Sequence, residues 1–458
     1  MTEIKSAALE LGTERIRKLL VQYAVPAIIA MTASSLYNMV DSIFIGHGVG
    51  PLAISGLALT FPLMNLAAAF GSLVGVGAAT LISMRLGQRD YETAQRVLGN
   101  VLVLNLIIGI AFGLVALLFL DPILYFFGAS EATIGYAREY MTVILLGNVV
   151  THMYLGLNSV LRASGHPRKS MYATINTVVI NTILDPLFIF GFGWGIRGAA
   201  IATVLAQVIS LVWQLRILSN KQELLHFRRG IYRLRKKIVR DMLAIGMSPF
   251  LMNLAACFIV ILINKGLKEY GGDLMIGAYG IVNRLAFFFV MIVLGVNQGM
   301  QPIAGYNFGA QQYDRVLKVL RLTIVCAVCV TSSGFVVGEF MPHLAVSLFT
   351  TDEELVRLAA DGMRIVFLCF PIIGFQMVTT NFFQSIGMAP KAIFLSLSRQ
   401  LLFLLPGLLF LPDILAGMGY NGSWGVWCSM PLSDLLASLV AALMLLRELR
   451  RFRKRMQI

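Results

Sequence analysis

The chain has 458 residues, of which 58 % are hydrophobic and only 13 % are charged, and its formal net charge is +14. Soluble domains carry about 25 % charged residues, so this composition excludes an ordinary solvated surface and indicates an outer face that meets lipid. The positive charge does not indicate nucleic-acid binding, because the basic residues lie between apolar runs and are not gathered with aromatic residues in one polar domain.

Twelve apolar runs are long enough to cross a bilayer, which needs about twenty helical residues. Backbone groups cannot stay unpaired in lipid, so the sequence predicts an all-α integral membrane protein with twelve transmembrane helices. Residues 1–18 are polar and mixed in charge, and the apolar run after them is long enough to span, so we expect no cleavable signal peptide. In chain order the runs are 19–46, 57–83, 97–120, 138–161, 170–192, 196–218, 241–267, 276–304, 319–341, 360–386, 392–411 and 424–446.

Basic residues alternate between successive loops, and excess Lys and Arg mark the cytoplasmic side. The N-terminal segment, the even-numbered loops and the C-terminal tail are basic, whereas loops 47–56, 121–137 and 412–423 contain no Lys or Arg. This pattern predicts a multi-pass protein of the plasma (inner) membrane with both termini in the cytoplasm.

The loop between the sixth and seventh runs is the only long polar connection. It predicts a basic cytoplasmic linker over 219–240, between an N-terminal lobe (1–218) and a C-terminal lobe (241–458). Within 226–242, four apolar residues fall on one stripe among basic ones, which predicts an amphipathic helix on the membrane surface. Those four are Phe227, Ile231, Leu234 and Ile238.

The two halves are similar at an offset of about 222 residues. Pro26 corresponds to Pro249, the segment around Gly87 to that around Gly309, and LRASGHPRKS to FQSIGMAPKA. Each half has an even number of runs, so the repeats are parallel, which predicts a substrate path between the halves.

Asp41 and Asp185 lie deep in predicted spans, where a charge is costly and marks a functional candidate. Asp41 shares a helix face with Tyr37 and Asn38, and Asp185 shares one with Asn181. Two carboxyl groups and an amide form an oxygen-rich group that suits a proton or Na⁺. The alternative is a structural hydrogen bond between helices.

The second half lacks both acids, since Asn264 and Leu405 stand at the corresponding positions. If ion coupling depends on these acids, it belongs to the first half. Arg284, Arg399 and Asp434 also lie in predicted spans, either as functional residues or as partners in structural pairs.

No catalytic, nucleotide-binding or resident metal motif is present in the sequence. There is no GxxxxGK[ST], and the CxxC of Cys326 and Cys329 has no second pair for zinc. We therefore expect a protein that is not an enzyme and has no cofactor other than a coupling ion.

The chain resembles the multidrug and toxic compound extrusion (MATE) family, most closely its bacterial multidrug-efflux branch, over about residues 15–450. The resemblance lies in the segment around Pro26 and Asp41, in GQRDYETAQRVL, LRASGHPRKS and NTILDPLFIFGFGWGIRGAAIATVLAQ, and in their second-half copies. The resemblance implies a V-shaped fold of two lobes that exports cationic or amphipathic drugs by alternating access, in exchange for H⁺ or Na⁺. The expected partners are these substrates and the bilayer, with no nucleic acid, and the expected state is a monomer.

By motif match, the resemblance implies a proton or Na⁺ site of Asp41, Asn181, Asp185 and Thr203. Acids that some members carry in spans seven and ten are missing here. Aromatic, Met and amide side chains suit variable ligands. The residues predicted to line the substrate path are Tyr37, Asn38, Asn158, Arg284, Phe287, Met291, Gln298 and Gln301.

Two other functions stay open from the sequence. A flippase for lipid-linked precursors, from the same superfamily, would need a large basic cavity, for which Arg284 is the only central candidate. A passive channel or a membrane scaffold would not respond to an ion gradient.

Overall fold

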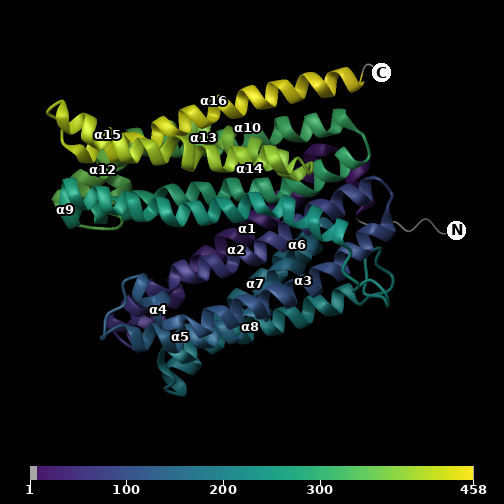
Figure 1. Cartoon of the computed structure of the whole chain (residues 1–458), viewed down its shortest axis with the longest axis horizontal. Helices are drawn as coiled ribbons and strands as arrows, with labels where there is room; N and C mark the ends of the chain where they lie inside the picture. The colour runs from purple at the N-terminus through teal and green to yellow at the C-terminus, as the bar shows by residue number, and fades with distance from the viewer. Residues whose placement is uncertain (1–7, 457–458) are drawn as a thin grey trace. The chain divides into compact units, whose positions relative to one another are not determined.

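The computed structural model describes residues 8–456, and within that range the chain forms helices joined by short loops, with no strand (Figure 1). The prediction of an all-α protein is therefore confirmed. The described residues form two compact units. Unit 1 comprises 8–15, Val25–Phe250 and Gly305–Gln311, and unit 2 comprises Ile16–Ala24, Leu251–Ala304 and the described residues from Gln312 onward. Relative to the two predicted lobes, unit 1 also contains 241–250 and 305–311, and unit 2 also contains 16–24.

The first half contains one short 3₁₀ turn, η1 (Leu9–Gly12), and then the helices of the first repeat. In chain order they are α1 (Ile16–Gly48), α2 (Pro51–Gly87), α3 (Tyr91–Leu118), α4 (Leu120–Phe126), α5 (Ile134–Leu146), α6 (Asn148–Ala163), α7 (Pro167–Pro186), the π-helical turn η2 (Leu187–Gly191) and α8 (Gly195–Leu218).

The second half begins with α9 (Lys236–Gly309), which consists of two helices that meet at Gly272. The φ angle of Gly272 is +72°, a conformation that glycine adopts without strain. The remaining elements are α10 (Tyr313–Phe340), α11 (Pro342–Ser347), α12 (Glu353–Phe367), α13 (Phe370–Ser385), α14 (Ala389–Leu397), the π-helical turn η3 (Ser398–Leu404), α15 (Leu405–Gly417) and α16 (Gly422–Met456).

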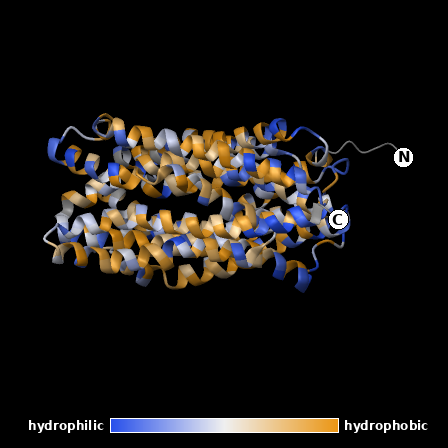
Figure 2. Ribbon diagram, turned by 90° about the horizontal axis from the view of Figure 1, so that it is seen from above, coloured by the Kyte–Doolittle hydropathy of each residue, from blue (hydrophilic) through white to orange (hydrophobic). Residues whose placement is uncertain are grey.

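Ten helical segments among the described residues are long and apolar enough to cross a membrane, and two bent pairs raise the number to twelve. The bent pairs are α5 with α6, at 56°, and α12 with α13, at 52°. Figure 2 shows hydrophobic residues along the helices and hydrophilic ones more often toward their ends. With each bent pair counted as one span, the number agrees with the sequence-based prediction.

Both halves depart from straight helices at corresponding places. A short helix follows the third span (α4 and α11), the fourth span is bent, and the fifth contains a π-helical turn (η2 and η3). Pro186 precedes η2 and Pro406 follows η3. Proline donates no backbone hydrogen bond, which favours a local change of helical pitch beside it. The internal repeat is therefore visible in the backbone as well as in the sequence.

The close approach of two helix ends in unit 1 repeats the same symmetry. A Cβ atom on Gly87 would lie 1.9 Å from the carbonyl oxygen of Tyr306, and one on Gly309 would lie 2.1 Å from that of Met84. Each residue of one contact stands 222 positions from its counterpart in the other. Only glycine fits at both positions, because any side chain would separate α2 from the end of α9.

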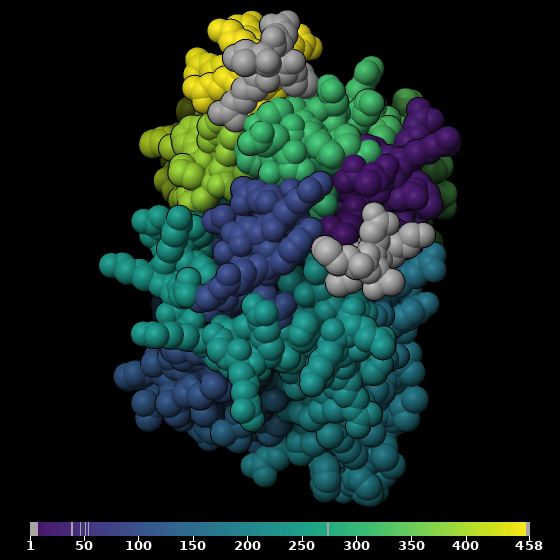
Figure 3. All heavy atoms as spheres, turned by 90° about the vertical axis from the view of Figure 1, so that its right-hand side faces the viewer, coloured from purple at the N-terminus to yellow at the C-terminus, as the bar shows by residue number. Residues whose placement is uncertain are grey.

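The basic linker differs from its prediction. Residues 219–235 form a loop and α9 begins only at Lys236, so the predicted amphipathic helix over 226–242 is wrong in its first ten residues. Its basic side chains are exposed, and Figure 3 shows side chains of this teal part of the chain on the outer surface.

The amide of Asn100 on α3 explains this loop. Its nitrogen donates to the carbonyls of Ile231 and Arg233 at 3.3 and 3.2 Å, and its oxygen accepts from the backbone nitrogen of Arg235 at 3.2 Å. These backbone groups bond to a side chain of α3 and are not paired along a helix. The buried Ile231 then packs against Gly99.

Candidate functional site

Two helices, α1 and α7, bring together in unit 1 the two acids that the sequence analysis singled out. Asp41 on α1 and Asp185 on α7 are 5 % and 0 % exposed, and their carboxyl groups are hydrogen-bonded to each other. Two ionised carboxylates in direct contact repel each other, so this hydrogen bond requires that Asp41 and Asp185 share a proton or a bound cation. The predicted convergence of α1 and α7 is therefore observed.

Asn181 and Thr203 complete the predicted group. In the orientation that satisfies both polar atoms of the Asn181 amide, the nitrogen donates to Oδ2 of Asp185 at 2.8 Å and to the Tyr37 hydroxyl at 3.2 Å. The amide oxygen then accepts from Oγ1 of Thr203 at 3.1 Å. Oγ1 of Thr203 also lies 3.0 Å from the hydroxyl of Tyr37. These contacts fix the positions of the polar side chains beside the carboxyl groups.

Tyr140 belongs to the same group, although no sequence pattern singles it out. It lies on α5, is 1 % exposed, hydrogen-bonds to Thr203 and interacts electrostatically with both Asp41 and Asp185. A single tyrosine in an apolar span has no sequence relation to acids on other helices. Its burial next to two carboxyl groups becomes apparent only when α5 packs on α8.

The electrostatics of the two units differ. The buried acids Asp434 and Glu448 of unit 2 are neutralised: Nε of Arg399 lies 2.5 Å from Oδ1 of Asp434, and Lys391 pairs with Glu448. In unit 1, Asp41 and Asp185 have no basic partner among the residues that the structure describes, and Oδ1 of each accepts no hydrogen bond there. Unit 1 therefore holds two buried carboxyl groups with free acceptor capacity for a cation.

The ligand chemistry of this group fits a light cation. Carboxylate, amide and hydroxyl oxygens are hard ligands that suit H⁺ or Na⁺. Among the side chains that the structure describes, no cluster of three or more His, Cys, Asp or Glu residues could hold a metal ion. The set of Asp41, Asn181, Asp185 and Thr203 is thus suited to an exchangeable ion rather than to a transition metal.

The residues predicted for a substrate path fall in different places. Tyr37 joins the carboxyl group in unit 1. The side chain of Asn38 lies outside the described part of the chain. Asn158 on α6 donates to Oγ1 of Thr174 at 3.0 Å and accepts from Oγ of Ser170 at 2.6 Å, so its amide bonds to α7 and not to the carboxyl pair itself.

The five remaining predicted residues lie on α9 in unit 2. Arg284 and Phe287 are exposed, Met291 and Gln298 are half-buried, and Gln301 is buried. The spacings of three, four and seven residues from Arg284 to Gln298 place these four side chains on one helix face. Their contact with a substrate stays a prediction.

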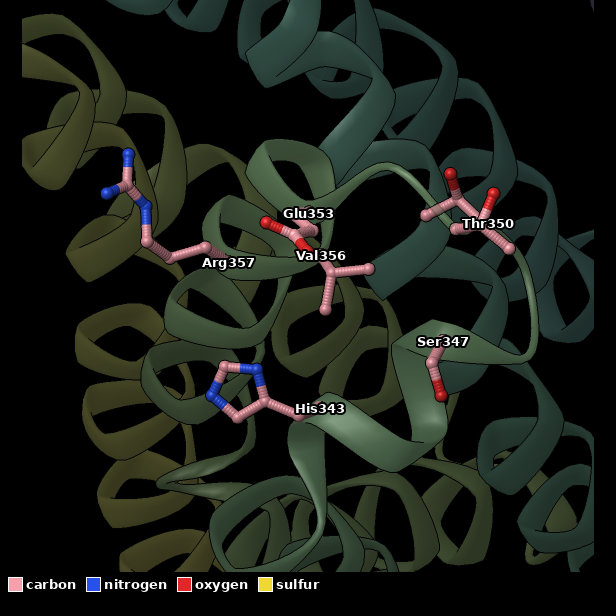
Figure 4. A pocket seen from close by; sticks show the side chains of 7 residues that line it. His343, Ser347, Thr350, Glu353, Val356 and Arg357 are labelled. Carbon is pink, nitrogen blue, oxygen red and sulfur yellow. The ribbon is translucent and has the colours of Figure 1, made fainter.

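Unit 2 also contains an open pocket of about 560 Å³ between α11 and α12. Figure 4 shows His343 on α11 and the side chains of Glu353 and Arg357 on α12 around it. None of the four predicted ion-site residues lines this pocket.

Comparison with known proteins identifies a matching family, related sequences and similar structures. The sequence model of the MatE family matches residues 26–187 and 246–409. The chain is 28 % identical over 424 residues to the multidrug export protein MepA of Staphylococcus haemolyticus, covering 93 % of this chain and 92 % of that protein. It is also 28 % identical over 437 residues to MepA of Staphylococcus aureus strain NCTC 8325 / PS 47, with 94 % of each covered.

Solved structures share the fold. The chain is 35 % identical to the MATE multidrug transporter DinF-BH, solved in complex with a ligand, with a TM-score of 0.87 over 95 % of this chain and 96 % of that one. A MATE protein in a bent conformation gives a TM-score of 0.92 at 24 % identity, over 98 % and 99 % of the two chains. The second likeness shows the fold alone.

Proposed function

The chain belongs to the MatE family of membrane transporters, and from this membership we propose that it exports amphipathic or cationic small molecules in exchange for H⁺ or Na⁺. It works by alternating access in the plasma membrane, with both termini in the cytoplasm, as the loop charges predict. The relatives support the drug substrates, since MepA is named as a multidrug export protein and DinF-BH as a multidrug transporter.

One observation carries the proposed coupling. Asp41 and Asp185 are buried against each other with no basic partner among the described residues, whereas the buried Asp434 and Glu448 of unit 2 are each paired with a cation. Burying two unpaired carboxylates is unfavourable. Binding of a cation therefore stabilises this pair of carboxyl groups in the folded protein. The exchangeable ion therefore belongs to unit 1.

The physical basis of exchange is competition for these carboxyl groups. An ion that binds Asp41 and Asp185 neutralises them and favours one arrangement of α1, α7 and α8. Its release restores two like charges and favours another. A cationic substrate then meets a negative site only after the ion has left, so the two species use the same charge in turn.

Transport into proteoliposomes, with pH and Na⁺ gradients imposed separately, tests the coupling. We expect the pH gradient or the Na⁺ gradient to drive ethidium accumulation in the wild type, and we expect Asp41→Asn to abolish this gradient-driven transport. Asp413→Asn is the control, because Asp413 is exposed and bonds only to the hydroxyl of Tyr270.

Correct insertion of the Asp41→Asn protein is checked by its yield and monodispersity in detergent. Unchanged gradient-driven transport by Asp41→Asn would overturn the coupling role of this site. Ethidium flux that ignores both gradients in the wild type would instead indicate a passive channel.

A further inference from the structure

One face of α7 is polar along its whole length in unit 1. Polar side chains recur every three or four residues from the loop before α7 to the carboxyl pair, and such spacings place them on one helix face. Helix faces at this depth are normally apolar, since each polar group costs free energy unless it is paired. The stripe consists of His166, Ser170, Thr174, Thr177, Asn181 and Asp185.

The two helices that pack against α7 carry matching stripes. On α6 the spacing of three and four residues aligns Thr151, Tyr154, Asn158 and Arg162. On α8 it aligns Thr203, Gln207, Ser210 and Gln214. Since α6, α7 and α8 pack on one another, the three stripes meet, and we refer to them together as the polar seam.

Hydrogen bonds across the polar seam form successive rungs. Oγ1 of Thr151 donates to Oε1 of Gln207 at 2.6 Å, next to the rung of Asn181 and Thr203 described above. One turn further along, Oγ1 of Thr177 donates to Oγ of Ser210 at 2.7 Å. Each rung joins two different helices.

The last rung lies nearer the N-terminus of α7. Oγ of Ser170 donates to Oδ1 of Asn158 at 2.6 Å, and Nδ2 of Asn158 donates to Oγ1 of Thr174 at 3.0 Å. The hydroxyl of Tyr154 bonds to both Thr174 and Thr177 and so connects this rung to the previous one. Consecutive rungs are otherwise one helical turn apart, about 5–6 Å, a distance that one water molecule bridges.

The polar seam is partly buried: Thr151, Asn158, Thr177 and Gln207 are half-buried, and other members are almost fully buried. Ser170 and Ser210 are 3 % and 1 % exposed, and Gln214 is 0 % exposed with neither of its side-chain polar atoms bonded to any described residue. A buried amide that is left unpaired loses the hydrogen bonds that it made to water in the unfolded chain. Packing alone would favour an apolar residue there, so Gln214 indicates that the seam is arranged for something that passes through it.

Titratable side chains stand at the loop end of the polar seam. Nε2 of His166 lies 2.9 Å from Oε2 of Glu223, and Nζ of Lys169 lies 3.1 Å from Oε1 of the same carboxylate. These three side chains connect the loop before α7 to the loop after α8. Burial lowers the pKa of His166, and the charge of Glu223 only partly opposes this shift, so a proton that reaches the imidazole is readily released.

We propose that the polar seam is a proton relay that connects the Asp41–Asp185 pair to His166 and Glu223 at the cytoplasmic surface. This inference rests on the proposed ion-coupled function and selects H⁺ as the ion. In one passage, protonated Asp185 gives its proton to a water molecule, each hydroxyl or single water along the seam accepts one proton and releases its own, and His166 takes the last one. The amide side chains of the seam orient these groups and carry no proton themselves. Asp185 ends as a carboxylate and His166 as an imidazolium, which releases the proton to the cytoplasm.

The chemistry of the rungs favours a proton over Na⁺. A hydroxyl both donates and accepts, so a chain of hydroxyls and single waters moves a proton without moving any heavy atom. Na⁺ needs about six oxygens around it at each step. Direct bonds of 2.6–2.7 Å between helices leave no room for such a shell.

Thr177 is the position at which to test the relay. Thr177→Val keeps the shape of the side chain and removes the hydroxyl, whereas Thr177→Ser keeps the hydroxyl. Thr182→Val is the matched control, because the Thr182 hydroxyl lies on the same helix outside the polar seam and bonds only to the carbonyl of Val178. The measurement is alkalinisation or acidification of pyranine-loaded proteoliposomes when ethidium is added, beside ethidium affinity in detergent.

We expect Thr177→Val to lower substrate-induced proton flux by about 10²-fold, with ethidium affinity within about twofold of wild type, and Thr177→Ser and Thr182→Val to keep most of the flux. Wild-type flux in Thr177→Val overturns the relay and leaves the coupling site standing. Equal losses in Thr182→Val also overturn it. If Thr177→Val does not fold, Ser210→Ala removes the same rung. No proton movement in the wild type, with transport driven by Na⁺, overturns the relay but not antiport itself.

Discussion

The hydroxyl of Tyr37 lies 3.0 Å from Oγ1 of Thr203, and this contact joins α1 to α8 beside the carboxyl pair. Both side chains also bond to the amide of Asn181 on α7. Three helices are therefore held together by three neutral polar groups next to two acids. The neutral groups keep the carboxyl groups in place whether or not these carry a cation.

A double-mutant cycle measures this contact. Tyr37→Phe and Thr203→Val each remove one hydroxyl. Each substitution should lower the free energy of unfolding less when the other is already present than it does in the wild type, with a coupling energy of about 1 kcal/mol. Thermal unfolding in detergent gives the four midpoints. Tyr172→Phe serves as a control, because Tyr172 is exposed on α7. Strictly additive shifts of Tyr37→Phe and Thr203→Val would contradict a direct interaction.

The pH dependence of stability reports on His166. Burial lowers the pKa of His166 below 6.5. As the pH falls toward the unfolded pKa and below it, the unfolded chain therefore binds more protons than the folded one. Stability that is present above the unfolded pKa is lost on acidification. We expect the melting temperature of wild type minus that of His166→Gln to decrease from about pH 7.5 to about pH 5.5. A difference that stays constant across these pH values would show that His166 does not titrate differently in the two states.

The sequence predicted the helical class, the number of spans and the meeting of Asp41 with Asp185, because a charge at membrane depth needs a partner wherever the chain places it. It did not predict Tyr140, whose role depends on the packing of α5 against α8. The polar face of α7 was present as a period of three to four residues from Ser170 to Asp185. Only the structure shows that α6 and α8 present matching faces.

The linker shows where sequence periodicity misleads. An apolar stripe among basic residues predicts a surface helix, but Asn100, more than a hundred positions away, bonds to the backbone of the linker and holds it as a loop. The bends between α5 and α6 and between α12 and α13 were also not predicted. Gly147 stands at the first bend and Pro371 follows the second, and neither residue alone distinguishes a bend from a straight span.

The paired glycines at the ends of α2 and α9 should be intolerant of any side chain. Gly87→Ala places a methyl group 1.9 Å from the carbonyl oxygen of Tyr306, and Gly309→Ala places one 2.1 Å from that of Met84. We expect each to destabilise by about 1–3 kcal/mol or more, because backbone must move apart. Gly280→Ala is the control, since a Cβ there meets no atom within 4 Å, and it should stabilise slightly. Equal melting temperatures for Gly87→Ala and Gly280→Ala would contradict this close contact.

The buried ion pair of Arg399 and Asp434 should contribute to stability and not to coupling. Asp434 is 2 % exposed and Arg399 is its cationic partner, so Asp434→Leu leaves an uncompensated guanidinium in unit 2. The cost should lie toward the lower end of about 3–5 kcal/mol, since Arg399 keeps part of its side chain exposed. Adding Arg399→Met should recover most of the lost stability, because an apolar pair buries no charge.

Melting temperatures of Asp434→Leu, Arg399→Met and the double variant test the ion pair, and ion-driven ethidium transport by the double variant tests whether the pair takes part in coupling. A double variant that folds as well as wild type but has lost coupling would place an ion-coupling residue in unit 2 and contradict the assignment to Asp41 and Asp185.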